Sequence, residues 1–222
     1  MSISKAWEWN KELNPIWLKP SEESYWISNM WQEQGYKNLL DFGCGLGRHS
    51  IFFSQQGFNV SAFDLSIEGT NHLRDWAKRE SLDIDITEAD MLDLPYNDDT
   101  FDCIFAYHVI SHTDSNGIKQ IMLELKRVLK PFGEVYLTFC SKESWSFARA
   151  GFPKIDENSV RKTDDGPEKG IPHFYMNLDD IISLFSSLNL ELLRIRRTDD
   201  CYFNGQKQDS KHYFVYAKNN CK

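Results

Sequence analysis

The sequence of 222 residues has the length of one elaborated domain, long enough to bury a full core without disulfide or metal staples. Its net charge of -8 and its pI near 5.3 oppose nucleic-acid binding, which would gather Lys and Arg on one face. The five scattered cysteines form no CxxC pair, so they indicate a reducing cytoplasm and neither a disulfide framework nor a zinc knuckle. No stretch approaches the roughly 18 apolar residues of a membrane span, and the N-terminus lacks an apolar targeting region, so we expect a soluble protein without a membrane partner.

The first 36 residues are rich in tryptophan and precede any regular pattern. Five of the seven tryptophans lie in this segment: Trp7, Trp9, Trp17, Trp26 and Trp31. Residues 26–31 place aromatic and aliphatic side chains at helical spacing, which favours a helix packed onto the core. Residues 1–36 therefore form an aromatic cap, either over a ligand site or simply against the fold.

From residue 37 onward, short apolar runs alternate with amphipathic stretches, a pattern typical of βα units. This pattern predicts an α/β fold, a Rossmann-like three-layer sandwich around a mostly parallel sheet. The expected strands cover residues 38–42, 59–65, 83–89, 101–109 and 134–140.

Two later helices and a terminal strand pair complete the expected fold. Apolar residues recur at helical spacing over 118–129, and Pro131 provides the stop. A second helix begins at Asn177, an Asx cap, and leads into a strand at 190–197. The last strand at 212–218 should pair with it as an antiparallel hairpin through the turn dipeptide Asn204-Gly205. Residues 141–174 do not fit the βα rhythm and are long enough to form a lid-like insertion.

The glycine-rich stretch LLDFGCGLGRHS at residues 39–50 is expected to carry a strand into a helix. Backbone N–H groups at such a point meet ligands at the carboxyl edge of a parallel sheet. A P-loop is excluded because no Gly-Lys-Ser/Thr follows. The dinucleotide fingerprint G-x-G-x-x-G requires its third glycine three residues after the second, at position 48, where this sequence has Arg48. The glycines alone therefore leave the nucleotide open.

Two acids follow in the order that a nucleoside site requires. Asp64 ends the second expected strand, where its carboxylate can accept hydrogen bonds from ribose hydroxyls. The alternative for Asp64 is a helix N-terminal acid, because Ser66 follows it. Asp90 ends the third strand, where it can accept from an adenine amino group or remain a solvated loop acid.

Taken together, these motifs resemble class I S-adenosylmethionine-dependent methyltransferases of the small-molecule DxGCGxG type. The resemblance covers about residues 37–140 and departs from the family pattern at Phe132, which stands where a glycine is usual. The matching residues are Asp41, Gly43, Cys44, Gly45 and Gly47, then Asp64, then Asp90 with LPYNDDTFD, then LKRVLKPFGEVYLTF.

The resemblance implies S-adenosylmethionine as cofactor, a seven-stranded sheet with an antiparallel last strand, and a methyltransferase domain over 37–222. It implies that Asp41 and the loop from Gly43 to Gly47 approach the methionine part, and that Asp64 holds the ribose. It also implies that Leu65 lies on adenine, that Asp90 and Met91 read its edge, and that Tyr107 lines the sulfonium side. Cys44 is expected to be a small buried residue beside the glycines rather than a nucleophile.

Methyl transfer from a sulfonium is an in-line displacement, so alignment and exclusion of water matter more than covalent machinery. The candidate bases and lining groups are His112, His108 and Tyr107, with His173 before the late helix. His112 alternatively caps the next helix. His108 and His112 are four apart and would share a helical face, but the spacing gives no third ligand, so no metal site is predicted.

A small-molecule acceptor is the expected substrate class, since the segment AYHVIS carries neither Asn/Asp-Pro-Pro-Tyr nor Pro-Cys of nucleic-acid methyltransferases. Two alternatives stay open, an NAD(P)-dependent oxidoreductase and a non-catalytic S-adenosylmethionine-binding protein. Arg48 and the run after Asp90 argue against the oxidoreductase. The acceptor and the oligomeric state are not specified by the sequence.

Overall fold

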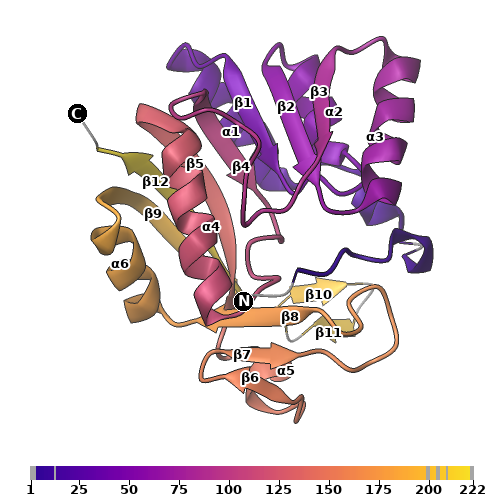
Figure 1. The fold of residues 1–222 in the computed structure, drawn as a ribbon, viewed down its shortest axis with the longest axis vertical. Coiled ribbons are helices and arrows are strands. Elements are labelled where there is room, and N and C mark those ends of the chain that lie inside the picture. The colour runs from indigo at the N-terminus through magenta and orange to yellow at the C-terminus, as the bar shows by residue number, and fades with distance from the viewer. Residues whose placement is uncertain (1–3, 13, 199–200, 204–205, 209, 221–222) are drawn as a thin grey trace.

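A twisted ten-stranded sheet forms the centre of the molecule in the computed structural model (Figure 1), which describes residues 4–12, 14–198, 201–203, 206–208 and 210–220. Seven strands follow the order β3-β2-β1-β4-β5-β12-β9. The first five are parallel, and β12 runs antiparallel to both of its neighbours. The predicted mostly parallel α/β sheet with an antiparallel last strand is therefore confirmed. The seven strands are β1 (Asn38–Phe42), β2 (Asn59–Asp64), β3 (Ile84–Glu88), β4 (Phe101–Ala106), β5 (Leu129–Ser141), β9 (Leu190–Thr198) and β12 (His212–Asn219).

Helices cover both faces of the sheet, because alternate side chains of each strand point to opposite faces. Leu39 of β1 belongs to a core cluster with α1 and α2, whereas Leu40 belongs to a cluster with α4 and α6. Helix α3 packs on the same face as α2 through Leu73 and Ala77. The helices are α1 (Glu22–Glu33), α2 (Arg48–Gln55), α3 (Ile67–Glu80), α4 (Ser115–Val128), α5 (Trp145–Ala148) and α6 (Leu178–Ser187), with the 3-10 turns η1 (Trp9–Lys11) and η2 (Pro15–Leu18).

The two late helices form where the sequence predicts them. The buried residues of α4 recur three and four apart, and Asp114 caps it by accepting from the backbone N–H groups of Asn116 and Gly117. Helix α6 starts with a capping box in which Asn177 and Asp180 exchange side-chain and backbone hydrogen bonds. Each helix therefore has a local signal for its start and an apolar face for burial.

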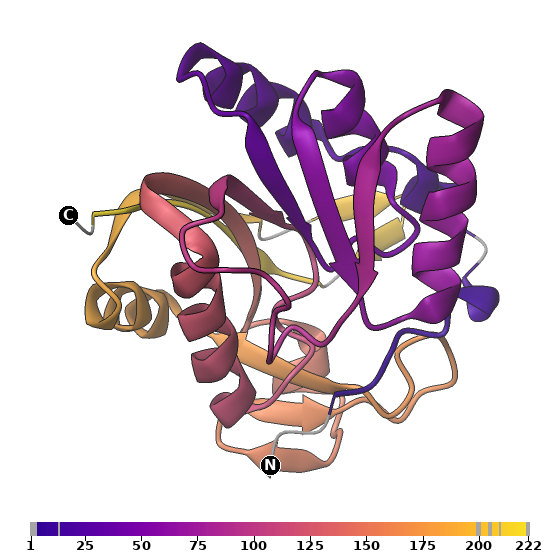
Figure 2. The ribbon, with the colours of Figure 1, turned by 45° about the horizontal axis from the view of Figure 1, so that its top comes forward.

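Residues 141–174 add a small antiparallel extension at the end of β5. Strands β6 (Lys154–Asp156), β7 (Ser159–Arg161) and β8 (Pro172–Met176) pair in sequence, and β8 continues the sheet beside β5. In Figures 1 and 2 the N-terminal segment runs between the carboxyl ends of β1 to β3 and this extension. Segments far apart in the sequence therefore meet at one end of the sheet.

The final strands pair antiparallel as predicted, β9 with β12. Between them lies a second short hairpin of β10 (Cys201–Phe203) and β11 (Gln206–Gln208), which the sequence reading did not anticipate. The turn dipeptide Asn204-Gly205 lies outside the described residues.

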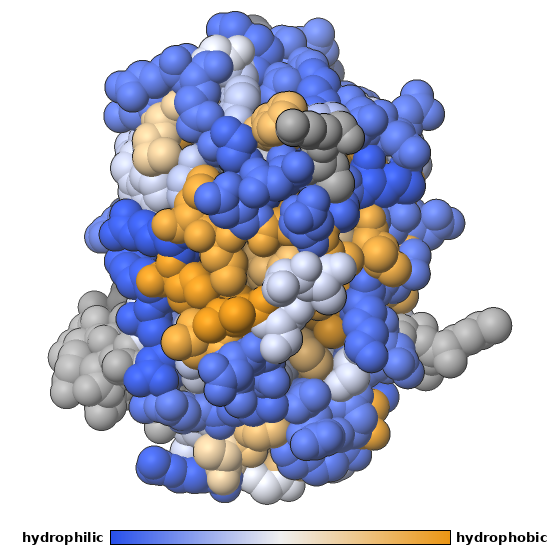
Figure 3. All heavy atoms as spheres, turned by 90° about the vertical axis from the view of Figure 1, so that its left-hand side faces the viewer, coloured by the Kyte–Doolittle hydropathy of each residue, from blue (hydrophilic) through white to orange (hydrophobic). Residues whose placement is uncertain are grey.

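Apolar side chains also gather on the outer surface, on the side that α6 and β9 form (Figure 3). Exposed large hydrophobic residues of these elements include Leu178, Ile182 and Leu193. Over the part of the chain that the structure describes, no helix has both the length and the apolar character to cross a membrane.

Candidate functional site

The glycine loop between β1 and α2 is fixed by both conformation and space. Gly43, Gly45 and Gly47 have φ values of +70°, +55° and +94°, the left-handed region that side chains disfavour. A Cβ at Gly43 would lie 2.2 Å from Val109 Cγ2, and one at Gly45 would lie 2.5 Å from Trp9 Cζ2. Glycine is therefore required at positions 43 and 45 by the space that Val109 and Trp9 occupy as well as by the turn geometry.

Asp64 at the end of β2 ties this loop to the start of α3. Its Oδ2 accepts from the Gly45 backbone N–H at 2.8 Å, and its Oδ1 accepts from the Ser66 N–H at 2.8 Å. Burial raises the pKa of Asp64, while these backbone hydrogen bonds oppose the rise. Ser66, and not Asp64, caps α3 by accepting from Gly69. Asp64 also lines the cavity beside the loop.

A cavity of about 90 Å³ lies over the glycine loop and Asp64. The loops after β1, β2 and β3 form one wall, and three tryptophans of the N-terminal segment form the other. The lining includes eight of the ten residues predicted for the cofactor: Gly43, Cys44, Gly45, Asp64, Leu65, Asp90, Met91 and Tyr107. Asp90 turns one oxygen back to its own loop, because Oδ1 accepts from the Leu92 N–H at 3.0 Å.

Asp41 and Gly47 do not line the cavity. Gly47 provides the N-cap of α2, where an added Cβ would lie 2.4 Å from Leu73 Cδ1. Asp41 lies beneath the loop with 2% of its surface exposed and accepts a hydrogen bond from the Ser50 hydroxyl. Burial raises the pKa of Asp41 to about 7, although Ser50 and the charge of Arg48 oppose the rise. Both residues therefore support the loop from behind.

Cys44 is a buried wall residue, as predicted. Its side chain is 6% exposed, and burial raises the pKa of its thiol well above the ordinary value. A thiol in that state is a poor nucleophile.

The tryptophans of residues 1–36 divide into two groups. Trp7, Trp9 and Trp17 pack together with ring centroids 5.3 to 5.7 Å apart, Trp7 and Trp9 stacked and Trp17 edge-on to both, and they line the small cavity. Trp31 is fully buried in α1 and donates to Glu134 Oε2 at 3.1 Å, and Trp26 packs on Tyr136. The first group thus lines a cavity, and the second packs against the core.

Arg48 fastens the first group to the fold, a role that the sequence did not suggest. Its guanidinium lies 4.8 Å from the centroid of the Trp17 ring and donates to the carbonyl oxygens of Ile16 at 3.0 Å and Lys19 at 3.3 Å. Arg48 also lies 5.5 Å from the ring of Tyr107, which follows β4. This arginine therefore joins the cap, the glycine loop and the end of β4.

The predicted helical face of His108 and His112 is wrong. Strand β4 ends at Ala106 and α4 begins only at Ser115, and His108 itself has a φ of +58°. The two rings therefore diverge: His108 lies 4.3 Å from the ring of His212, and burial lowers its pKa well below the usual value.

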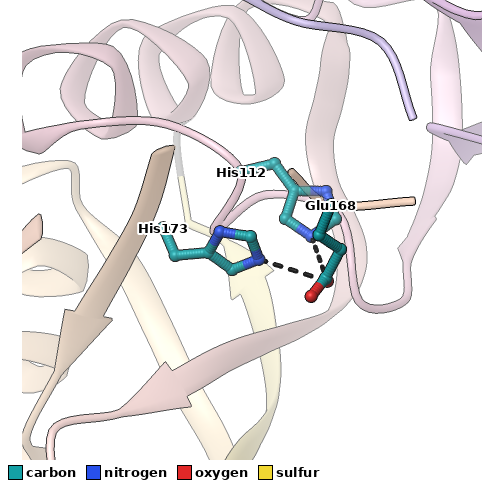
Figure 4. Close-up of side chains that lie close together, drawn as sticks. All are labelled: His112, Glu168 and His173. Carbon is teal, nitrogen blue, oxygen red and sulfur yellow. Dashed lines mark hydrogen bonds and ion pairs between the residues drawn. The ribbon is translucent and has the colours of Figure 1, made fainter. Parts of the chain in front are cut away.

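His112 turns instead toward the insertion, where Glu168 and His173 meet it (Figure 4). Glu168 Oε1 lies 3.6 Å from His112 Nε2 and 3.2 Å from His173 Nε2. Burial lowers the pKa of His173 to about 4, against the opposing effect of Glu168. Burial would raise the pKa of Glu168, but its bonds to both histidines and the charge of Lys162 hold it well below the usual range. Sequence spacing gave no signal for this cluster, because His112 lies in the loop after β4 whereas Glu168 and His173 lie in the insertion, His173 on its strand β8.

A larger cavity of about 960 Å³ adjoins the first. Its walls come from the N-terminal segment, the loop after β4, the 141–174 insertion and the edges of β9 and β12. The two cavities share Trp7, Trp17, Tyr107, His108 and His112. The aromatic members of its lining include Trp145, Phe152, Tyr175 and Phe214. One small and one large ligand space thus meet at a common wall.

Comparison with known families gives a match to the family model described as Methyltransferase domain over residues 39–133. Ubiquinone biosynthesis O-methyltransferase from Rickettsia bellii is 23% identical over 233 residues, covering 98% of this chain and 92% of that protein. Methyltransferase GfsG from Streptomyces halstedii is 34% identical over 104 residues, covering 46% of this chain and 36% of that protein.

Solved structures share the fold at low identity. A methyltransferase from Methanosarcina mazei, described as S-adenosylmethionine-dependent, superposes with a TM-score of 0.75 at 20% identity, covering 92% of this chain and 100% of that chain. The 1,6-didemethyltoxoflavin-N1-methyltransferase of Burkholderia thailandensis, solved with that compound and S-adenosylhomocysteine, gives 0.65 at 14% identity, covering 90% and 79%.

Proposed function

We propose that this chain, which belongs to the class I S-adenosylmethionine-dependent methyltransferases, methylates a hydroxyl group of a small aromatic acceptor. The enzyme class and the cofactor follow from family membership. The same membership argues against the NAD(P)-dependent oxidoreductase. The acceptor is the proposal. One observation carries it: a cavity of about 960 Å³ with aromatic walls shares a wall with the cavity over the glycine loop.

On the cofactor side, we assign the residues of the smaller cavity to parts of S-adenosylmethionine. Asp64 holds the ribose hydroxyls with the lone pairs left free by Gly45 and Ser66. Leu65 lies against adenine, with Asp90 and Met91 at its edge, and Tyr107 lies on the sulfonium side. Asp41 and Gly47 act indirectly by holding the loop.

The cap and the insertion act together as a lid. The Glu8 backbone N–H donates to the Pro167 carbonyl at 3.2 Å, joining the two segments. The cavity of about 90 Å³ is well below the roughly 300 to 1,000 Å³ of small-molecule sites, because Trp9 lies over Gly45. Within the described residues, the indole N–H groups of Trp7 and Trp9 are buried without a hydrogen-bond partner. Cofactor entry therefore displaces Trp9.

The aromatic lining and the histidines of the larger cavity support the acceptor class. Flat aromatic walls bind a flat aromatic molecule by stacking and burial. A hydroxyl nucleophile must lose its proton during transfer. A group near the shared wall therefore has to accept that proton or stabilise the negative charge on the oxygen. His108 and His112 both line the two cavities, and the side chain of His112 is 17% exposed. His112 is the better placed base, because burial lowers the pKa of His108 well below its usual value. The Rickettsia bellii relative is named as an O-methyltransferase, which agrees with this class.

The test is methyl transfer from labelled S-adenosylmethionine to size-matched aromatic panels bearing hydroxyl, amino or carboxylic acid groups, with products identified by mass spectrometry. We expect methyl ethers from the hydroxylated panel. His112→Gln should lower kcat by about 10²-fold to 10⁴-fold and leave S-adenosylhomocysteine affinity unchanged, while His108→Gln should have a smaller effect. Methylation confined to amines or carboxylates would contradict the proposal.

A further inference from the structure

His112, Glu168 and His173 present three ligand atoms to one point on the wall of the larger cavity (Figure 4). The three atoms lie within 4.8 Å of one another. In a tetrahedral zinc site with bonds of about 2.0 to 2.1 Å, ligand atoms are roughly 3.3 Å apart. The separations of Glu168 Oε1 from the two histidine nitrogens, 3.2 and 3.6 Å, are close to this value, and the two histidine nitrogens, which lie within 4.8 Å of each other, approach further when an ion binds.

Both ring nitrogens of His173 face oxygen atoms that only accept hydrogen bonds. Nδ1 lies 3.2 Å from the Ile171 carbonyl oxygen, and Nε2 lies 3.2 Å from Glu168 Oε1. A neutral imidazole can donate to only one of them, so when Nδ1 donates to Ile171, Nε2 directs a lone pair at the carboxylate. A cation between Nε2 and Oε1 then satisfies both atoms, as a second proton on the ring would.

The surroundings of the cluster hold two of its members in this orientation. The Ile171 carbonyl fixes the ring of His173, and Lys162 forms an ion pair with Glu168 Oε2, leaving Oε1 for the two histidines. Partners of this kind orient metal ligands in proteins. The charge of Lys162 opposes a nearby cation, so we expect moderate rather than extreme affinity.

We propose that His112, Glu168 and His173 bind a divalent transition-metal ion, Zn²⁺ in the first instance, with an open position facing the larger cavity. Two imidazoles and one carboxylate suit zinc better than Mg²⁺ or Ca²⁺, which prefer oxygen ligands. This inference rests on the proposed function, because the ion would bind the acceptor oxygen and lower the pKa of its hydroxyl. His112 then acts as a ligand of the ion rather than as the base itself.

Metal binding is tested directly on the chelator-treated, full-length protein. Calorimetric titration with Zn²⁺, and visible absorption with Co²⁺ as a spectroscopic substitute, should each show one equivalent bound. Glu168→Gln should weaken binding by at least about 100-fold and remove the Co²⁺ bands. Glu157→Gln, an exposed glutamate in the β6–β7 turn, is the matched control and should bind as the unaltered protein does.

S-adenosylhomocysteine affinity serves as the folding check, and we expect it to be unchanged in Glu168→Gln. His112→Gln, which changes a less buried ligand, should give the same loss of metal. Absence of metal binding, or equal binding by the unaltered protein and both ligand variants, would overturn the metal site. Metal bound at these residues without methylation of any hydroxyl would instead contradict the proposed function and leave the metal site standing.

Discussion

The two cavities differ in how the chain builds them. The smaller one is lined on one side by loops that follow three neighbouring strands, with bare backbone and two carboxylates in short motifs. The larger one draws its walls from the N-terminal segment, the loop after β4, the insertion and the last strands. In the proposed assignment, cofactor recognition is therefore encoded locally, whereas acceptor recognition depends on contacts between distant segments.

The largest expected effect concerns the buried carboxylate beneath the glycine loop. The pKa of Asp41 is about 7 in the fold and near 3.9 when unfolded, so the folded state binds the extra proton between these values. Stability from this group is present at low pH and is lost as pH rises from about 4 to 7. Between pH 5 and pH 8 the unfolding free energy of Asp41→Asn should rise relative to that of the unaltered protein by about 2 to 3 kcal/mol.

Urea denaturation of both proteins at several pH values measures this difference. Ser50→Ala is a useful companion, since it removes the hydrogen bond to Asp41 and keeps the carboxylate. A difference that does not change with pH would show that Asp41 is ionised throughout and that the cofactor side is less desolvated than we infer.

The next effect concerns the tryptophan wall of the smaller cavity. In this structure, Trp9 lies over Gly45 and blocks the cofactor cavity, so it has to move before the cofactor enters. Trp9→Ala removes this blocked state and should raise the association rate of S-adenosylhomocysteine by up to about tenfold. Stopped-flow fluorescence measures the rate. Trp76→Ala on α3, which does not line the cavity, is the control and should leave it unchanged. Equal rates in the Trp9 variant would argue against the lid.

The features that the sequence predicts are the local ones, and those that it does not predict depend on contacts between distant segments. The strand-to-helix glycines, Asp64 and the cap at Asn177 are local signals, and the elements around them form as expected. The meeting of Glu168 and His173 with His112 depends on an insertion that folds against the loop after β4, and no spacing encodes that contact. The helical face expected for His108 and His112 failed because the chain is irregular between β4 and α4.

The smallest effect lies far from both cavities, at the one departure from the family motif. Phe132 has a φ of +63°, and half of its side chain is exposed. Left-handed backbone costs a non-glycine residue roughly 1 to 2 kcal/mol, partly offset by the greater freedom of an unfolded glycine. Phe132→Gly should raise the unfolding free energy by about 0.5 to 1 kcal/mol in urea denaturation. Phe132→Ala keeps the strained backbone and should give no gain.

The most direct test of the cofactor side is calorimetric titration with S-adenosylmethionine, S-adenosylhomocysteine and NADH. It should be done on the unaltered protein, on Asp64→Ala and on Asp93→Ala, an exposed loop carboxylate that serves as control. We predict binding of both sulfur nucleosides, no binding of NADH, and a loss in Asp64→Ala of about 1.5 to 3 kcal/mol, roughly 10-fold to 150-fold in affinity. Unchanged affinity in Asp64→Ala would contradict the ribose assignment, and binding of NADH alone would contradict the assignment of the cofactor.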